Sequence, residues 1–194
     1  MSLKTWTVKR VERKDIRDFI EKWHYSKNIN GCIADYCYAL YKPCGDMVGA
    51  MFFGRMAMAN QWKRFSDNPY NVIELRRLCC IDDTPKNTES YFIGRALRLL
   101  KQNWGEGCVV SYADKEHGHS GIIYKASNFE MIGEIPGARV IIMGDKQYHD
   151  KTIRTKYKGV LKPFAKRVKD ALENGDAFYK KTAGKYTYIY NLIK

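Results

Sequence analysis

The sequence predicts a mixed α/β fold in which one central sheet is flanked by helices. Segments with the period of a strand alternate with segments whose apolar residues recur at helical spacing, and turn-forming residues separate them. The length of 194 residues suits one domain with a hydrophobic core. We therefore expect a single domain over residues 1–194.

The first predicted elements are a strand at residues 5–11, a helix at 14–23, and two strands at 32–41 and 47–53. The helix follows from apolar residues spaced so that they share one face, namely Ile16, Phe19, Ile20 and Trp23. The two later strands flank the turn sequence Pro43-Cys44-Gly45-Asp46 and therefore predict a hairpin.

The middle of the chain predicts a strand–helix–strand unit. A strand at residues 71–81 is rich in branched side chains, and Asn87 is expected to cap a helix that runs to about Asn103. A short strand follows at residues 108–112. Residues 56–70, before this unit, have no clear period and form a long connection.

The last third is expected to contain a short helix at 121–127, strands at 129–133 and 139–143, a helix at 165–174 that ends at Gly175, and a strand at 185–193. In that last strand, Tyr186, Tyr188 and Tyr190 share one face. The order of elements, with an early hairpin and a central strand–helix unit, resembles the GNAT acyltransferase fold. A Rossmann fold is disfavoured because no Gly-x-Gly-x-x-Gly follows a strand.

Positive charge is concentrated near the C-terminus. The chain has 34 Lys and Arg and 21 Asp and Glu, a net charge of +13. Residues 146–194 hold 13 of the basic and four of the acidic residues, a net +9, within the same predicted domain. Such a concentration attracts a polyanion, either nucleic-acid phosphates or an anionic membrane, or it is merely a solubilising surface.

We favour double-stranded DNA as the partner of this basic region. The candidate phosphate contacts there are Lys166, Arg167 and Lys169. A second candidate group is Lys63 and Arg64, whose aromatic neighbours Trp62 and Phe65 either stack on a base or form an aromatic flap.

The sequence indicates neither a signal peptide nor a membrane span. Charged residues interrupt every apolar stretch of residues 1–20, and the longest uncharged apolar run is far shorter than the ~20 residues that cross a bilayer. A cytoplasmic location without membrane association is therefore expected. The six cysteines include no Cys-x-x-Cys pair, which predicts free thiols rather than disulfides or a zinc site.

The densest polar cluster follows the strand at residues 108–112. Asp114 is placed to act as a general base, or to cap the short helix that follows, a role open to Ser120 as well. Asp114, His117 and His119 also match a two-histidine, one-carboxylate metal site, although no metal is assigned. His24, at the end of the first helix, either stabilises that helix end or takes part in chemistry.

A series of short motifs resembles the phage Mom family of DNA-modification proteins. The motifs are His24-Tyr25-Ser26-Lys27, Glu74-Leu75-Arg76-Arg77-Leu78, Asp82-x-x-Pro85-x-Asn87-x-x-Ser90, Ser111-Tyr112-Ala113-Asp114, and Gly118-His119-x-Gly121-x-Ile123-Tyr124-x-Ala126-x-Asn128, followed by Gly133. The resemblance covers residues 20–135 and extends only loosely to the basic tail. His117 is not a recognised position of this pattern.

The resemblance implies a GNAT-like enzyme that converts adenine in DNA into a carbamoylmethyl form and so protects phage DNA from host restriction. It implies seven site residues: His24, Tyr25, Arg77, Ser111, Asp114, His119 and Tyr124. The substrates would be double-stranded DNA, from which the adenine is flipped, and a small-molecule group donor, acyl-CoA-like or of another kind. The enzyme would act in the cytoplasm of the host bacterium.

Two other functions are compatible with the same sequence. One is an acyl-CoA-dependent N-acyltransferase that acts on a protein or a small-molecule amine. Against it, the loop after the strand at 71–81, where GNAT enzymes bind pyrophosphate with a glycine-rich turn, contains Asp82, Asp83 and Pro85. The other is a basic DNA-binding protein without enzymatic activity, which would bind DNA in a salt-sensitive manner and leave its bases unchanged.

Overall fold

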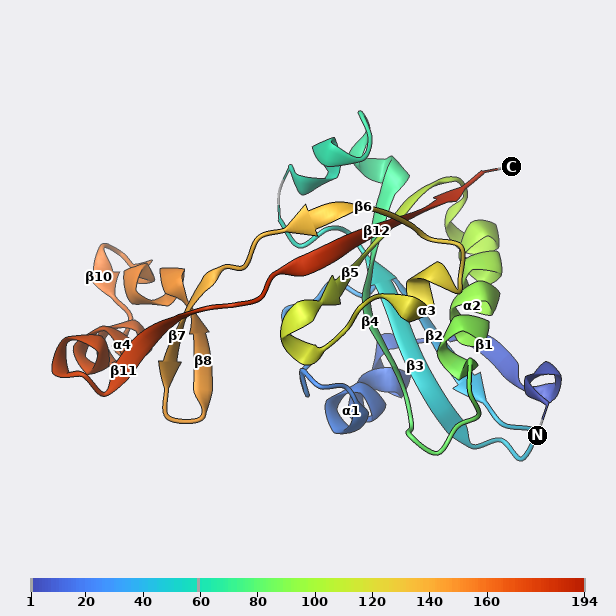
Figure 1. Ribbon diagram of the computed structural model, residues 1–194, viewed down its shortest axis with the longest axis horizontal. Coiled ribbons are helices and arrows are strands. Elements are labelled where there is room, and N and C mark those ends of the chain that lie inside the picture. The colour runs from blue at the N-terminus through green and yellow to red at the C-terminus, as the bar shows by residue number, and fades with distance from the viewer. Residues whose placement is uncertain (1, 59, 194) are drawn as a thin grey trace. The chain divides into compact units, whose positions relative to one another are not determined.

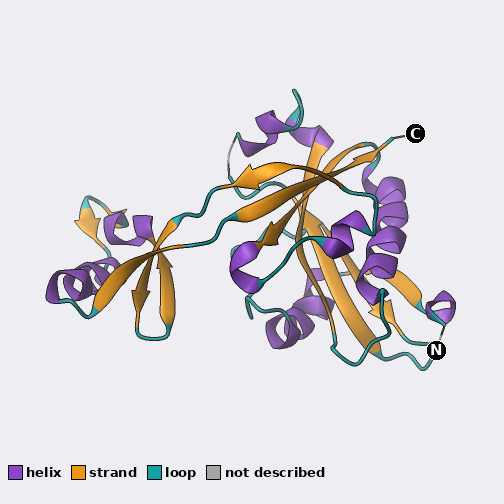
Figure 2. Cartoon of the chain, in the orientation of Figure 1, coloured by secondary structure: helices purple, strands orange, loops and turns teal. Residues whose placement is uncertain are grey.

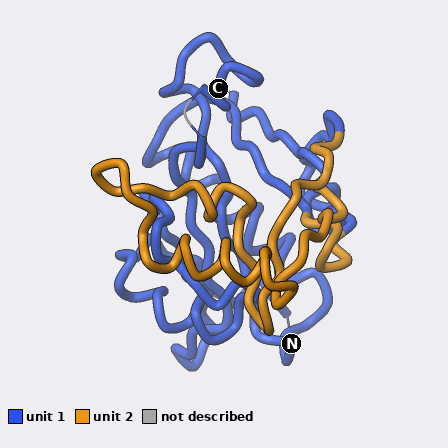
Figure 3. The backbone as a smooth tube through the Cα atoms, turned by 90° about the vertical axis from the view of Figure 1, so that its left-hand side faces the viewer, with its two compact units in different colours: residues 1–113, 120–133, 186–194 blue, residues 114–119, 134–185 orange. Residues whose placement is uncertain are grey.

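The structure is a computed structural model that describes residues 2–58 and 60–193. Its internal contacts divide the chain into two compact units, coloured blue and orange in Figure 3. The first unit comprises residues 1–113, 120–133 and 186–194, and the second comprises residues 114–119 and 134–185. Residues 146–185 of the basic C-terminal part therefore share the second unit with residues 114–119 and 134–145. Residues 186–194 belong to the first unit. That the two units fold as one domain stays a prediction.

One seven-stranded mixed sheet forms the centre of the first unit (Figures 1 and 2). Its strands are β1 (Thr7–Val11), β2 (Tyr36–Tyr41), β3 (Met47–Gly54), β4 (Val72–Cys80), β5 (Gly107–Asp114), β6 (Glu130–Ile135) and β12 (Lys185–Leu192), in the order β1-β2-β3-β4-β5-β12-β6. The helices are α1 (Arg13–Trp23), α2 (Thr88–Trp104) and the single turn α3 (Ile122–Lys125), with 3₁₀ turns at Leu3–Thr5, Gln61–Arg64 and Pro69–Asn71. Strands β1 to β4 pair antiparallel, and β4 pairs parallel with β5.

The two long helices cover opposite faces of this sheet. Alternate residues of β3 belong to different clusters, since Met51 packs with residues of α2 and Phe52 packs with residues of α1. On α1, Ile16 and Ile20 are fully buried as the helical spacing predicts, whereas Trp23 is exposed. The face of α2 consists of Phe92, Ile93, Ala96, Leu97 and Leu100. The predicted α/β architecture is therefore confirmed.

Strands β4 and β5 pair only over their first halves. Pairing runs from Val72 opposite Cys108 to Leu75 opposite Ser111, after which each strand continues without the other. On the far side of β4, Phe52 pairs with Arg77 and Phe53 with Leu75, which leaves Arg76 as an extra, bulged residue. A divergence between two neighbouring central strands thus opens just after the pair Leu75 and Ser111 (Figure 1).

Several predicted elements differ in detail from those observed. Asn87 occupies the N-cap position of α2, but its backbone is left-handed (φ 70°) and its side chain makes no capping hydrogen bond, so the predicted cap is wrong. The strand expected at residues 108–112 runs on to Asp114, and the strand expected at 32–41 begins only at Tyr36. The short helix after the polar loop is capped by neither Asp114 nor Ser120, since Gly121 holds its N-cap position.

The second unit is a small α/β assembly of its own. It contains the sheet β11-β7-β8, formed by β7 (Arg139–Met143), β8 (Lys146–His149) and β11 (Ala177–Lys181), the hairpin of β9 (Lys156–Tyr157) and β10 (Val160–Leu161), the helix α4 (Pro163–Asn174), and 3₁₀ turns at Lys115–His117 and Asp150–Arg154. Ile141, Val168 and Ala177 form its core. Helix α4 ends at Gly175, which is left-handed (φ 84°) as predicted.

All six cysteines are free, as predicted. Within residues 2–58 and 60–193, no helix has the length and apolar character needed to cross a membrane.

Candidate active site

The divergence of β4 and β5 gathers buried polar atoms. Within the described part of the chain, six buried side-chain atoms lack a hydrogen-bond partner of standard geometry, and three of them are Nε of Arg76, Nε of Arg77 and Oγ of Ser111. An unpaired buried polar atom costs about 1–3 kcal/mol. Arg76 and Arg77 lie on the face of the sheet that α1 covers, and Ser111 lies on the face that α2 covers. Such atoms persist where another molecule satisfies them, so their presence on both faces marks the divergence as a candidate binding site.

Tyr124, on α3, brings a hydroxyl group next to Ser111. Burial raises the pKa of Tyr124 to about 12, while the adjacent Ser111 hydroxyl partly offsets this rise. The nearby hydroxyls of Tyr25 and Tyr188 raise the pKa further. At neutral pH the Tyr124 hydroxyl is therefore protonated and serves as a hydrogen-bond donor rather than as a base.

The ring of Tyr124 is held in an aromatic cluster. It lies 5.3 Å from the ring of Tyr188 and 5.5 Å from that of Phe129. Gly121, which precedes α3, has a left-handed backbone, and a Cβ there would lie only 2.3–2.4 Å from the Tyr188 ring. The glycine is therefore required for α3 to approach β12 closely enough to place Tyr124 beside Ser111.

His24 and Tyr25 lie where α1 ends. The His24 ring is buried, and its Nδ1 accepts the backbone N–H of Ser26 at 3.1 Å. Because Nδ1 is an acceptor, the neutral ring carries its proton on Nε2. The rings of His24 and Tyr25 lie 4.2 Å apart, and Tyr25 remains half exposed. The structure thus brings His24, Tyr25, Ser111 and Tyr124 into one series of neighbours.

The opposite face of β4 and β5 holds a charged group that we did not predict as part of the site. Glu74 and Arg76 form an ion pair of 3.7 Å whose side chains are only 12% and 10% exposed. Burial raises the pKa of Tyr112 to about 12, and the Glu74 charge adds to this effect. Gln61 donates a hydrogen bond of 2.7 Å to the Tyr112 hydroxyl. The available signal was the presence of three charged residues inside an otherwise apolar strand.

Asp114 has a clear structural role in the second unit. Its Oδ1 accepts the backbone N–H of Glu116 at 3.1 Å and so caps the 3₁₀ turn Lys115–His117. Its Oδ2 lies 2.9 Å from Nζ of Lys185. Burial by itself would raise the pKa of Asp114, but the hydrogen bond and charge of Lys185, the Glu116 N–H and nearby His117 together hold it below its usual value. Asp114 is therefore ionised at neutral pH.

The proposed two-histidine metal site is not formed. His117 and His119 are both exposed, with ring centroids 6.3 Å apart, and the Asp114 carboxylate is engaged by Lys185 and a backbone N–H. Among residues 2–58 and 60–193, no group of three or more His, Cys, Asp or Glu side chains is arranged to hold a metal ion. This interpretation of Asp114, His117 and His119 was therefore wrong.

The start of α2 does not suit a pyrophosphate. The residues before it include exposed Asp82 and Asp83, and Glu89 lies in its first turn. Carboxylates at this end of a helix oppose the binding of an anion that the backbone N–H groups would otherwise favour. The site of CoA diphosphate binding in GNAT enzymes is therefore a poor fit in this chain.

The predicted phosphate contacts face solvent. On α4, Lys166 and Arg167 are exposed, and Lys169 forms a surface ion pair of 3.5 Å with Glu173. Lys63 and Arg64 are also exposed. Their neighbours Trp62 and Phe65 pack against Val72, Cys108 and Val110, so these two rings cover the sheet, as an aromatic flap does.

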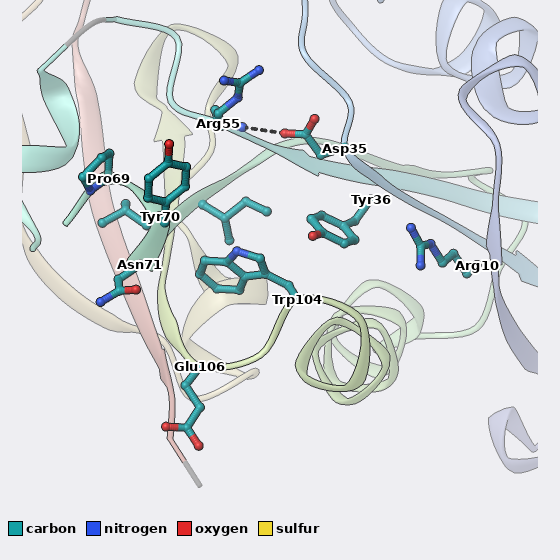
Figure 4. A pocket seen from close by; sticks show the side chains of 11 residues that line it. Arg10, Asp35, Tyr36, Arg55, Pro69, Tyr70, Asn71, Trp104 and Glu106 are labelled. Atoms are coloured by element: carbon teal, nitrogen blue, oxygen red, sulfur yellow. Dashed lines mark hydrogen bonds between the residues drawn. The ribbon is translucent and has the colours of Figure 1, made fainter.

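A cavity of about 740 Å³ lies at the other end of β4 and contains none of the predicted site residues. Figure 4 shows the rings of Tyr36, Tyr70 and Trp104 around it, with Arg10 and Arg55 nearby. Asn71, just before β4, also lines it, whereas the divergence lies at Arg76. We place the candidate site at the divergence rather than at this cavity, because the divergence holds buried polar atoms without a hydrogen-bond partner of standard geometry.

Comparison with known proteins identifies both family and fold. The chain matches the sequence model of the Mom protein family over residues 5–194. It is 30% identical over 148 residues to "Methylcarbamoylase mom" of Escherichia phage Mu, an alignment that covers 74% of this chain and 59% of the phage protein. The chain thus spans less than two thirds of the length of this relative.

Solved acetyltransferases share the fold. The spermidine N-acetyltransferase from Vibrio cholerae in complex with CoA and spermine has a TM-score of 0.52 at 9% identity, covering 97% of this chain and 96% of that one. A mutant of the Vibrio cholerae spermidine N-acetyltransferase has a TM-score of 0.53 at 9% identity, covering 97% and 94%. At such identities the likeness concerns the fold alone, and it confirms the GNAT-like α/β prediction.

Proposed function

The chain belongs to the Mom protein family, and we propose that it is an enzyme that transfers a carbamoylmethyl-type group to N6 of adenine in double-stranded DNA. The name of its phage Mu relative, a methylcarbamoylase, supports the class of group transferred. The protection of phage DNA from host restriction, inside the bacterial cytoplasm, is the biological role that accompanies this activity.

The observation that carries the proposal is the buried hydroxyl of Ser111, which has no hydrogen-bond partner of standard geometry and lies beside the Tyr124 hydroxyl, at the point where β4 and β5 part. In an open α/β sheet, ligands bind beyond the carboxyl ends of parallel strands, and β4 and β5 pair parallel before they diverge. Both the place of these residues in the fold and their unsatisfied polar atoms support the proposal.

Each residue of the site is assigned a role that its environment supports. The protonated Tyr124 hydroxyl donates a hydrogen bond to the carbonyl oxygen of the transferred group, and Ser111 binds the adenine amine. Tyr25 is half exposed and offers its ring to the extruded base. His24 donates through Nε2, which follows from the hydrogen bond at its Nδ1.

Arg77 and Asp114 complete the assignment. Arg77 lies directly after the bulge, and its guanidinium orients a carbonyl or carboxylate of the donor. As the N6–carbon bond forms, the bond between that carbon and the rest of the small-molecule donor breaks, and the remainder of the donor leaves with the electron pair. Asp114 accepts the N6 proton, for which a weak base suffices, because the amine becomes acidic once its bond to carbon has formed. His119, in the exposed loop after Asp114, is included only for its place in the motif.

Adenine N6 lies inside the duplex stack, so the base must leave the helix to be modified. The exposed cations of the second unit are proposed to hold the phosphates during this step. The donor is a small molecule, and acetyl-CoA is disfavoured because Asp82 and Asp83 precede α2 and Glu89 lies in its first turn.

The experiment is the expression of the protein in bacteria, followed by digestion of cellular DNA to nucleosides and mass spectrometry. We expect a deoxyadenosine derivative heavier by one carbamoylmethyl substituent, which is absent from cells with an empty vector. A protein that only binds DNA would leave deoxyadenosine unchanged. A thermal-shift titration tests the acyltransferase alternative, since stabilisation by acetyl-CoA would favour it over our proposal.

A further inference from the structure

The hairpin β9–β10 in the second unit presents apolar side chains to solvent. Tyr157 pairs with Val160 across a two-residue turn in which Lys158 (φ 48°) and Gly159 (φ 82°) are both left-handed. This geometry is that of a tight type I′ turn, and it places Tyr157 and Val160 on the same face. Their exposed fractions are 66% and 70%.

These two side chains contribute nothing to the core of their own unit. That core is built by Ile141, Val168 and Ala177, with half-buried residues of β8, α4 and neighbouring segments around them. Leu161, on the other face of the hairpin, is half buried, whereas Tyr157 and Val160 are not. An exposed aromatic and an exposed branched side chain at the tip of a defined hairpin indicate a contact with another molecule.

The charges around the hairpin identify the chemistry of that molecule. Residues 151–162 contain five Lys and Arg and no Asp or Glu. Arg154 forms an ion pair with Asp150, at 3.5 Å, just before this segment. The four lysines, by contrast, form no ion pair with any residue that the structure describes: Lys151, Lys156, Lys158 and Lys162. The exposed apolar tip and the surrounding lysines together fit a polyanion that has apolar surface between its charges. Duplex DNA, with its stacked bases between two lines of phosphates, is such a polyanion.

We propose that the hairpin β9–β10 is a wedge that enters duplex DNA at the extruded adenine. This inference rests on the proposed function. When a base leaves the stack, the neighbouring base pairs lose their contacts, and an apolar side chain inserted at that step offsets part of the cost. Tyr157 and Val160 fill this space while the lysines hold the flanking phosphates. A two-stranded ribbon is narrow enough for the major groove, which is about 12 Å wide.

The test separates insertion from electrostatic binding. Tyr157→Thr/Val160→Thr removes the apolar tip but keeps every charge and the strand-forming tendency of both positions. Phe178→Thr is the matched control, because Phe178 is an equally exposed aromatic (61%) on β11 of the same unit. Tyr157→Trp retains a large apolar ring. Each full-length variant is assayed for binding to a labelled duplex and for permanganate oxidation of unstacked thymines in it.

We expect wild type, Phe178→Thr and Tyr157→Trp to increase thymine oxidation equally. The double variant should retain affinity within about threefold and lose oxidation by about tenfold, the scale of one lost stacking contact. Equal oxidation by the double variant and the wild type would contradict the wedge, as would an absence of oxidation with the wild type.

Two further measurements separate this proposal from other outcomes. The amount of modified deoxyadenosine in cells tests the proposed function independently of the wedge. If the wild type and the double variant modify DNA equally well, the proposed function stands and the wedge is contradicted. Binding to phosphatidylglycerol vesicles tests a lipid partner. Loss of vesicle binding in the double variant, with its DNA oxidation unchanged, would assign the hairpin to a membrane and overturn the wedge.

Discussion

At the residue level, the site depends on side chains whose buried polar atoms are incompletely paired. Ser111 and Tyr124 are brought together from β5 and α3, and the high pKa of Tyr124, caused first by burial, makes its hydroxyl a donor. The motif resemblance pointed to both residues. Glu74 and Tyr112 lie within its motifs but were not among the site residues that it implied, because their proximity depends on the parallel pairing of β4 and β5 rather than on local sequence.

Asp114 is the residue at which structure and catalysis are most easily separated. Asn caps a turn about as well as Asp, so Asp114→Asn should keep the fold while removing the charge. We expect near-normal melting temperature and DNA binding, with modified adenine reduced by about 10²-fold, the usual scale for loss of a general base. Asp145→Asn, at an exposed turn of the same unit, is the control.

A purely structural Asp114 would give the opposite pattern. Asn would then leave modification intact, and Asp114→Ala would destabilise the protein by about 1 kcal/mol through loss of the cap. Full modification of DNA by a folded Asp114→Asn variant would show that Asp114 has only a structural role.

The ion pair between Asp114 and Lys185 makes stability dependent on pH. Because the pKa of Asp114 is lower in the folded protein than its ordinary value of 3.8, the ionised form stabilises the fold above that pH, and this contribution is lost as pH falls through the folded-state value. Lys185→Gln should therefore lower the melting temperature more at pH 6 than at a pH well below 3.8, where Asp114 becomes protonated. Equal effects at both pH values would show that the lysine acts by packing only.

At the level of elements, the sequence was most informative where periodicity is strong. Helices α1, α2 and α4 and the hairpin β2–β3 lie close to their predicted positions, because apolar spacing and turn residues act locally. Strands β8, β9, β10 and β11 were missed. They are short and rich in Lys and Tyr, and their pairing depends on contacts within the second unit rather than on a local alternation.

The exposed face of α4 is the element most readily tested as a DNA contact. Its cations project away from Ala165 and Val168, which are buried. Replacement of Lys166, Arg167 and Lys169 by Glu should weaken binding to all sequences alike and reduce the salt dependence by about one unit per lost phosphate contact.

The matched control reverses the same number of charges on α2 in the first unit, where three exposed cations lie at helical spacing: Arg95, Arg98 and Lys101. An equal loss of affinity in both triple variants would mean that net charge alone attracts DNA. Unchanged affinity of the α4 variant would exclude α4 from the DNA surface.

At the level of the whole molecule, most of the proposed site residues belong to the first compact unit, whereas Asp114, His119 and most of the basic C-terminal part belong to the second. The first unit contains His24, Tyr25, Ser111 and Tyr124. The second, with 58 residues, carries 14 Lys and Arg against eight Asp and Glu. Composition alone predicted the basic region, but its boundary depends on tertiary contacts, since residues 114–119 and 134–145 share its unit and residues 186–194 do not.

The central claim is that the site at the divergence of β4 and β5 modifies adenine. The most direct measurement is the fraction of modified deoxyadenosine, by mass spectrometry of digested DNA, in cells that express Ser111→Ala. The matched control is Ser127→Ala, which removes another buried serine hydroxyl, one that donates a hydrogen bond of 2.8 Å to the carbonyl of Ile123 within the α3 segment. We predict that Ser127→Ala retains modification, whereas Ser111→Ala folds normally and loses it by about 10²-fold, the scale of one lost transition-state hydrogen bond. Full modification by folded Ser111→Ala, or unmodified DNA in cells that express the wild type, would contradict the account.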